Sequence, residues 1–235
     1  MDYVVNLLKA NADEKYADFH SKLVPTIERK RILGVRTPVM RKLAKELLKD
    51  ESFVKEVMPA FLKELPHYYY DEAFLHGEII SKEKDYDKAV AMIEEFLPYV
   101  DNWAVCDLLD PKVFAKHKAE LMQNIVRWLK SDKVYTVRFG IDMMIKHFLD
   151  GEFDESHLTL VRDANGDDYY IKMAKAWYYS TALVKQYEIT RNYLINSITD
   201  EWILKKSIQK ARESFRLTNE QKEELKTSKN TISVM

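Results

Sequence analysis

A tryptophan and a carboxylate stand four residues apart in segment 98–110, which reads Pro-Tyr-Val-Asp-Asn-Trp-Ala-Val-Cys-Asp-Leu-Leu-Asp. One proline begins the segment, another follows it, and Asp101 or Asn102 can cap a short helix between them. In that helix Trp103 and Asp107 share one face, because residues four apart are neighbours on a helix surface. A helix that turns a large indole and an acid the same way, away from its apolar stripe, is unusual, so the pair is a candidate functional site. The alternative is structural: Trp103 packs at the core edge and Asp107 caps or pairs locally.

The other side of this helix is apolar and should face the core; it consists of Ala104, Val105, Leu108 and Leu109. The single cysteine, Cys106, lies in the same helix, where a buried and inert thiol is expected. A lone cysteine excludes an intramolecular disulfide and a thiolate metal cluster, and it fits a reducing cytoplasm, which is the expected location.

Basic residues gather in three segments although the formal net charge is only −1. Residues 28–49 hold eight basic and two acidic residues, and residues 112–138 hold seven and two. Residues 205–216 hold five basic residues and one acidic residue, whereas acids concentrate in 50–101 and 150–168. This segregation suggests a surface for a polyanion with an acidic back, but ordinary solvated helix faces give the same pattern.

Length and composition bound the class of protein. The 235 residues suffice for one large domain or two small ones. Five glycines and six prolines are few for an all-β chain. No apolar run approaches the roughly 20 residues that span a bilayer, and the N-terminus lacks a signal-peptide pattern. We therefore expect no membrane association, and we expect a monomer.

Apolar residues recur at helical spacing along almost the whole chain. Val39, Leu43 and Leu47 form one such stripe, and Thr37-Pro38 before it reads as an N-cap followed by a first-turn proline. Further helices are expected at 2–10, 11–31 with an interruption at Pro25, 54–65, 67–81, 86–97, 113–129, 133–149, 169–184, 187–197, 200–215 and 218–226, with a loop at 163–166.

About thirteen helices of ~10–17 residues with short connections predict an all-α fold. Their lengths favour an α-solenoid of HEAT-like antiparallel helix pairs, with a repeat near 35–45 residues and a concave basic face. One such domain is expected over 1–226, with a frayed C-terminal tail over 227–235. Internal sequence repetition is weak, and a compact irregular bundle is the alternative.

Several kinds of chemistry lack their motifs. The six histidines include no His-x3-His pair for a zinc site. The chain has no phosphate loop, no Gly-x-Gly-x-x-Gly and no Gly-x-Ser-x-Gly. We expect neither a metal nor an organic cofactor.

Over roughly residues 15–217 the chain resembles the DNA alkylation repair family of HEAT-like DNA glycosylases, the AlkD-type enzymes. Four motifs in order carry the resemblance: Leu33-Gly34-Val35-Arg36-Thr37-Pro38 with Arg41-Lys42-Leu43, Asn102-Trp103-Ala104-Val105-Cys106-Asp107, Thr136-Val137-Arg138-Phe139, and Ile171-Lys172-Met173-Ala174-Lys175-Ala176-Trp177.

The resemblance implies hydrolysis of the N-glycosidic bond of N3- or N7-alkylated purines in double-stranded DNA. Asp107 would be the essential carboxylate, Trp103 and Trp177 would form two aromatic walls, and Arg138 would hold the backbone near the lesion. An alkylated purine already carries positive charge and needs no general acid, so one carboxylate can stabilise the sugar cation and position water. The family acts without flipping the base into a pocket. The cations expected to contact the DNA backbone are Arg36, Arg41, Lys42, Lys205 and Lys206.

The chain departs from the family pattern at the rim of the implied site. Family enzymes carry a second Trp before the first one and an acid after it, where this chain has Asn102 and Ala104. They also carry a basic residue where this chain has Ser180. A non-catalytic HEAT-repeat paralogue that binds distorted or branched DNA is therefore the main alternative, and a protein-binding scaffold is a third.

Overall fold

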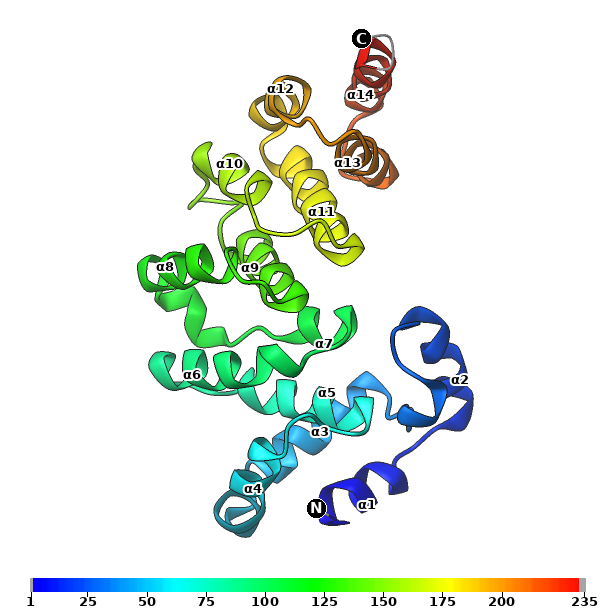
Figure 1. The fold of residues 1–235 in the computed structure, drawn as a ribbon, viewed down its shortest axis with the longest axis vertical. Coiled ribbons are helices and arrows are strands. Elements are labelled where there is room, and N and C mark those ends of the chain that lie inside the picture. Colours follow the sequence, from blue (N-terminus) through cyan, green and yellow to red (C-terminus); the bar gives the residue numbers. More distant parts are fainter. Residues whose placement is uncertain (1, 233–235) are drawn as a thin grey trace. The chain divides into compact units, whose positions relative to one another are not determined.

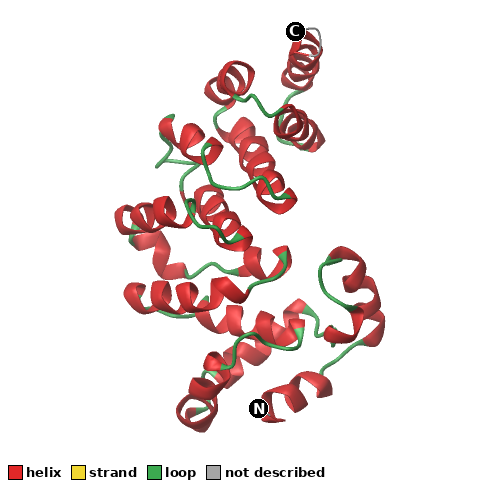
Figure 2. Ribbon diagram, viewed as in Figure 1, coloured by secondary structure: helices red, strands yellow, loops and turns green. Residues whose placement is uncertain are grey.

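The computed structural model describes the backbone of residues 2–232 and the side chains of residues 3–227. Every regular element in that range is a helix, which confirms the all-α prediction (Figure 2). None of the described helices combines the length and the apolar character needed to cross a membrane. The helices divide into two compact units, Met1–His117 and Lys118–Met235. The single HEAT-like domain over 1–226 stays a prediction.

The first unit runs from blue to green in Figure 1 and contains seven α-helices. They are α1 (Asp2–Ala10), α2 (Glu14–Leu23), α3 (Thr37–Leu47), α4 (Met58–Lys63), α5 (Tyr70–Ile80), α6 (Tyr86–Phe96) and α7 (Trp103–Leu108). Short 3-10 turns cover Arg29–Arg31, Leu97–Tyr99 and Lys112–Lys116, and a π-helical turn covers Phe53–Val57. Helix α5 is the centre of the unit, because α1, α3, α6 and α7 all pack against it.

The second unit contains α8 (Lys118–Trp128), α9 (Val134–His147), α10 (Ser156–Arg162), α11 (Tyr169–Lys185), α12 (Tyr187–Ser197), α13 (Glu201–Glu213) and α14 (Asn219–Ile232). Helices α9, α11 and α13 pack in succession. Helices α8, α12 and α14 each cover one of them (Figure 1). A row of helices covered by a second row is the arrangement of helical repeats, so this unit fits the predicted solenoid class.

Several details differ from the sequence-based prediction; for example, the helix expected over 113–129 is interrupted at His117, between a 3-10 turn and α8. Arg36, with extended backbone, is the N-cap of α3, so Thr37 and Pro38 belong to its first turn. The helix expected over 54–65 changes from a π-helical turn to α4 at Met58, because Pro59 has no N–H to continue the ladder. Helix α14 continues through residues 227–232 of the expected tail, and residues 233–235 lie outside the described residues.

A buried carboxylate fixes the segment that leads into α3. Asp71, on α5, accepts hydrogen bonds from the backbone N–H groups of Leu33 at 2.7 Å, Gly34 at 3.2 Å and Val35 at 2.7 Å. Burial raises the pKa of Asp71, and the three donors act against that rise. Because each of these polar groups would be costly to bury alone, the carboxylate and the loop hold each other in place.

Gly34 lets this loop approach the beginning of α2. Its φ of 90° lies in the left-handed region, and a Cβ there would lie 2.3 Å from the carbonyl oxygen of Asp13. The carbonyl of Gly34 in turn accepts a hydrogen bond from the N–H of Asp13 at 3.2 Å. Only glycine fits both the conformation and the space.

Replacing Asp71 with asparagine should lower the unfolding free energy by about 3 kcal/mol, because an amide turns donor atoms towards backbone N–H groups. Asp87→Asn is the matched control, since Asp87 is exposed in the first turn of α6. That control should change the unfolding free energy by less than about 0.5 kcal/mol. Urea unfolding of both variants checks this. Equal effects would show that Asp71 is not a structural anchor.

Two histidines form a second polar contact inside the first unit. His67 Nε2 lies 2.9 Å from His76 Nδ1, and the two rings stack on Phe61 and Phe96 respectively. Burial lowers the pKa of His67 to about 4 and, with the neighbouring His67, that of His76 to about 3. One ring donates and the other accepts, so the contact requires the neutral form of the acceptor.

These lowered pKa values predict a loss of stability in mild acid. Below pH ~6.5 the unfolded chain binds protons at both histidines while the folded chain does not, so stability is full above pH ~6.5 and falls towards pH ~4. The slope should reach up to about 1.4 kcal/mol per pH unit for each histidine. His67→Gln removes one titrating group and should flatten this slope between pH ~6.5 and ~5, measured by urea unfolding. Identical slopes for variant and wild type would contradict the assignment.

Candidate functional site

The short helix α7 presents the tryptophan and carboxylate that the sequence singles out. Asn102 is buried and caps the helix, since its side-chain oxygen accepts a hydrogen bond from the N–H of Val105 at 2.9 Å. The core-facing side contains Val105 and Leu109 as predicted, together with the buried thiol of Cys106. Ala104 and Leu108, also expected to face the core, are only half-buried.

Trp103 and Asp107 are both half-buried, one turn apart on α7. The indole N–H of Trp103 donates a hydrogen bond to the backbone carbonyl of Leu23, the last residue of α2, at 2.9 Å. This bond anchors the edge of the indole ring at the end of α2. The geometry therefore suits an aromatic wall beside a carboxylate.

Helix α5 holds α7 at two points. Gly77 allows close packing, because a Cβ at that position would lie 2.8 Å from Cδ1 of Leu108 and 3.2 Å from Cδ2 of Leu109. At the end of α5, the hydroxyl of Ser81 donates to the carbonyl of Gly77 at 2.8 Å and accepts from the N–H of Asp110 at 3.1 Å. The candidate helix is thus attached along its length and just beyond its end.

The predicted DNA-binding cations of the first unit are exposed and lie at the beginning of α3. Arg36 contacts Asp13 at 2.9 Å and lies 5.0 Å from the ring centroid of Tyr16. Arg41 contacts the buried Glu78 at 3.1 Å. Lys42 lies 3.8 Å from a carboxylate oxygen one turn further along α3. The exposed pairs of Arg36 and Lys42 are worth only about 0–1 kcal/mol each, so phosphates can compete for these two cations.

The basic and acidic segments of the sequence are not separated in space throughout. Four cations of residues 28–49 pair with acids from outside that segment: Arg29 with Asp18, Arg31 with Asp101, Arg36 with Asp13 and Arg41 with Glu78. The expected division into a basic face and an acidic back does not hold for these pairs, because folding brings distant acids to the cations.

In the second unit, Arg138 ties α9 to α11. The residue is only 5 % exposed, and its guanidinium donates a hydrogen bond to the backbone carbonyl of Tyr170 at 2.9 Å. Phosphate binding by Arg138 stays a prediction, and this burial makes it a weaker candidate than the exposed lysines and arginines.

Trp177 is half-buried on α11, two turns after Tyr170, whose carbonyl accepts the hydrogen bond from Arg138. Its backbone carbonyl accepts hydrogen bonds from the hydroxyl of Ser180 at 2.8 Å and from that of Thr181 at 2.9 Å. The hydroxyl of Ser180, which stands where family enzymes carry a basic residue, is therefore bonded within its own helix.

Lys205 and Lys206 lie in the middle of α13 beside an aromatic ring that the sequence analysis did not select. Lys205 pairs with Glu201, and Lys206 lies 5.9 Å from the ring centroid of Trp202. These lysines, Trp177 and Arg138 thus come from three successive packed helices, α13, α11 and α9. Among the described residues, no group of three His, Cys, Asp or Glu side chains is placed to hold a metal ion.

Comparison with known proteins agrees with the resemblance seen in the motifs. The sequence model of a family described as DNA alkylation repair enzyme matches residues 4–213, which is most of both units. None of the curated proteins compared with the chain matches it. Because the family match covers far more than half of the sequence, this chain belongs to the DNA alkylation repair enzyme family.

Proposed function

We propose that this protein is a DNA glycosylase that removes N3- or N7-alkylated purines from duplex DNA by hydrolysing the N-glycosidic bond. The observation that carries the proposal is the Trp103–Asp107 pair, half-exposed on a helix whose other side is buried. Membership of a DNA alkylation repair family supports DNA as the substrate, and the alkylated purine is what the resemblance of the motifs implies. The protein would act as a monomer and without a cofactor.

Asp107 would stabilise the positive charge that develops on the deoxyribose as the base leaves. The alkylated purine is already cationic, so the bond to the sugar breaks without a proton donor, and the bonding electrons depart with the base. Water then attacks the sugar cation and loses a proton to solvent, which leaves a hydroxyl on the sugar; the carboxylate both stabilises that cation and orients the water.

Trp103 would place an indole face beside the cationic centre, an interaction worth roughly 0.5–2 kcal/mol depending on desolvation. The hydrogen bond from its ring N–H to Leu23 supports this role, because the ring needs no reorganisation on binding. The roles of Trp177 as a second wall and of Arg138 at the backbone rest on the resemblance alone.

A non-catalytic DNA-binding protein is the second candidate, and two observations favour it. Asn102 and Ser180 stand where family enzymes carry a second Trp and a basic residue, and both side chains here bond to backbone of their own helix. Neither position therefore offers the aromatic or cationic group that a family enzyme presents there. DNA binding itself depends on the exposed cations and is common to both candidates.

Duplex binding should weaken steeply as salt rises, because bound cations displace counterions from DNA. Lys42→Gln should reduce the slope of log K against log salt by about one, alike for all sequences. Lys55→Gln is the matched control: Lys55 is 72 % exposed and paired one turn away with Glu51, as Lys42 is 75 % exposed and paired with Glu46. The control should leave the slope unchanged. Salt-independent binding, or equal effects of both variants, would contradict a DNA interface at α3.

Asp107→Asn keeps the size of the side chain but removes its charge. Release of N7-methylguanine from methylated duplex DNA should fall by about two orders of magnitude or more. Duplex affinity should stay equal or rise slightly, since phosphates repel a carboxylate. Asp87→Asn serves again as the control and should leave excision unchanged. An active wild type with an equally active Asp107→Asn would show that the carboxylate is misassigned. A wild type that binds duplex DNA but releases no base would establish the second candidate.

A further inference from the structure

Two exposed aromatic rings meet in the second unit, outside the site proposed above. Tyr169 begins α11 and is 56 % exposed, and Trp202 lies in the first turn of α13 and is 37 % exposed. Their ring centroids lie 5.9 Å apart at an interplanar angle of 65°. Single exposed aromatics are common on protein surfaces, but a touching pair open to solvent is a candidate binding surface.

Both rings stand on helix ends that are held firmly. Lys172 on α11 contacts the N-cap residue Asp200 of α13 at 2.9 Å, which ties the two helices beside the rings. Burial alone would raise the pKa of Asp200, but Lys172 and the N–H of Ile203 hold it below its ordinary value. The guanidinium of Arg138 binds the carbonyl of Tyr170, directly after Tyr169. The aromatic surface is therefore organised before any ligand arrives.

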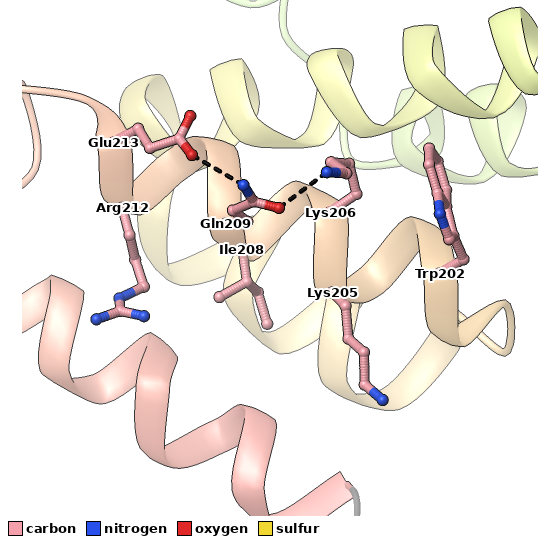
Figure 3. Close-up of a pocket in the computed structure, with 7 residues that line it drawn as sticks. All are labelled: Trp202, Lys205, Lys206, Ile208, Gln209, Arg212 and Glu213. Atoms are coloured by element: carbon pink, nitrogen blue, oxygen red, sulfur yellow. Dashed lines mark hydrogen bonds between the residues drawn. The ribbon is translucent and has the colours of Figure 1, made fainter.

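Cations lie beside the rings on α13. The ammonium of Lys206 lies 5.9 Å from the ring centroid of Trp202 and donates a hydrogen bond to Gln209 at 2.9 Å. Gln209 in turn donates to Glu213 at 3.0 Å, so a chain of polar contacts orients Lys206 along the helix (Figure 3). A surface hollow on α13 is lined by Trp202, Lys205, Lys206 and Arg212 among others, and in Figure 3 Lys205 and Arg212 point away from the chain of polar contacts. The helix carries four cations and two carboxylates.

We propose that Tyr169, Trp202 and Lys206 bind one unpaired nucleotide of DNA. The base would stack on the aromatic pair, and Lys206 would contact the adjacent phosphate. Stacking requires an open face of the base; in a regular duplex both faces are covered by neighbouring base pairs, whereas a bulged, frayed or single-stranded nucleotide offers one. An acidic peptide would match the charge of the lysines, but its carboxylates would offer no aromatic face to stack on the two rings.

This inference rests on the proposed function only in taking DNA as the ligand. Tyr169 precedes Trp177 by eight residues on α11, or about 12 Å along the helix axis. The nucleotide site is therefore close to the second candidate wall, yet it uses none of the residues assigned to excision. It would give the protein a preference for DNA that is locally unpaired over fully paired DNA.

Fluorescence anisotropy with labelled DNA tests the proposal. The probes are a fully paired duplex, the same duplex with one bulged thymine, and oligothymidine. Wild type should bind the bulged duplex about tenfold more tightly than the paired one, and Trp202→Ala and Tyr169→Ala should each abolish most of that difference. Trp202→Phe keeps an aromatic face and should retain most of the preference. Phe215→Ala is the control, because Phe215 is a fully exposed aromatic of the same unit outside the cluster.

Equal affinity of wild type for bulged and paired duplex would overturn the proposal. So would a Trp202→Ala variant that weakens both probes alike, or polyglutamate that competes with the bulged duplex as well as oligothymidine does. The two proposals fail separately. Loss of the bulge preference without loss of base release contradicts only the nucleotide site, and absent base release with an intact preference contradicts only the glycosylase.

Discussion

The position of Trp103 depends on the carboxylate of Asp71, although the two residues do not belong to one site. Asp71 on α5 holds the N–H groups of residues 33–35, and Gly34 in that loop accepts a hydrogen bond from Asp13 at the beginning of α2. At its other end, α2 offers the carbonyl of Leu23 to the indole N–H of Trp103. Helix α7, which carries Trp103, packs against α5, which carries Asp71. These contacts therefore form a closed series from α5 through the loop and α2 to α7. The candidate site is thus positioned by backbone polar groups that need partners when they are buried.

In the second unit, buried cations rather than a buried acid provide the partners of backbone polar groups. The buried ammonium of Lys175 donates to the carbonyls of Arg162 at 3.0 Å and Ala164 at 2.7 Å, at the end of α10. Burial lowers the pKa of Lys175, while nearby carboxylates act in the other direction. Arg138 likewise binds the carbonyl of Tyr170 at the beginning of α11. A buried acid therefore satisfies N–H groups in the first unit, and buried cations satisfy carbonyls in the second. The two motifs of the second unit that resemble the family contain Arg138 and Lys175. Each of these residues makes a structural hydrogen bond to a backbone carbonyl.

The sequence predicts the helices well because apolar periodicity is a local property that burial then satisfies. Helix α12 matches its prediction over all of 187–197, and Asn102 caps α7 by a mechanism visible from its neighbours. What the sequence does not predict depends on distant contacts. The charge segregation is partly undone when Glu78 pairs with Arg41, and the burial of Arg138 follows from the packing of α9 on α11. Trp202 was missed because its significance comes from Tyr169, which is 33 positions away along the chain but touches it in space.

The half-buried position of Asp107 on α7 supports the proposed enzyme over the binding protein in one physical respect. A carboxylate at a DNA-binding surface does not itself strengthen binding, because the phosphates of the ligand repel it. In the proposed reaction the same group would become favourable as positive charge develops on the sugar, which is the property required of a catalytic residue. The side chains of Asn102 and Ser180 bond to backbone of their own helix, so neither offers an aromatic ring or a cation at the rim of the site. The pair of Trp103 and Asp107 is present all the same. The departures from the family pattern therefore bear more on base excision than on DNA binding, which depends on the exposed cations.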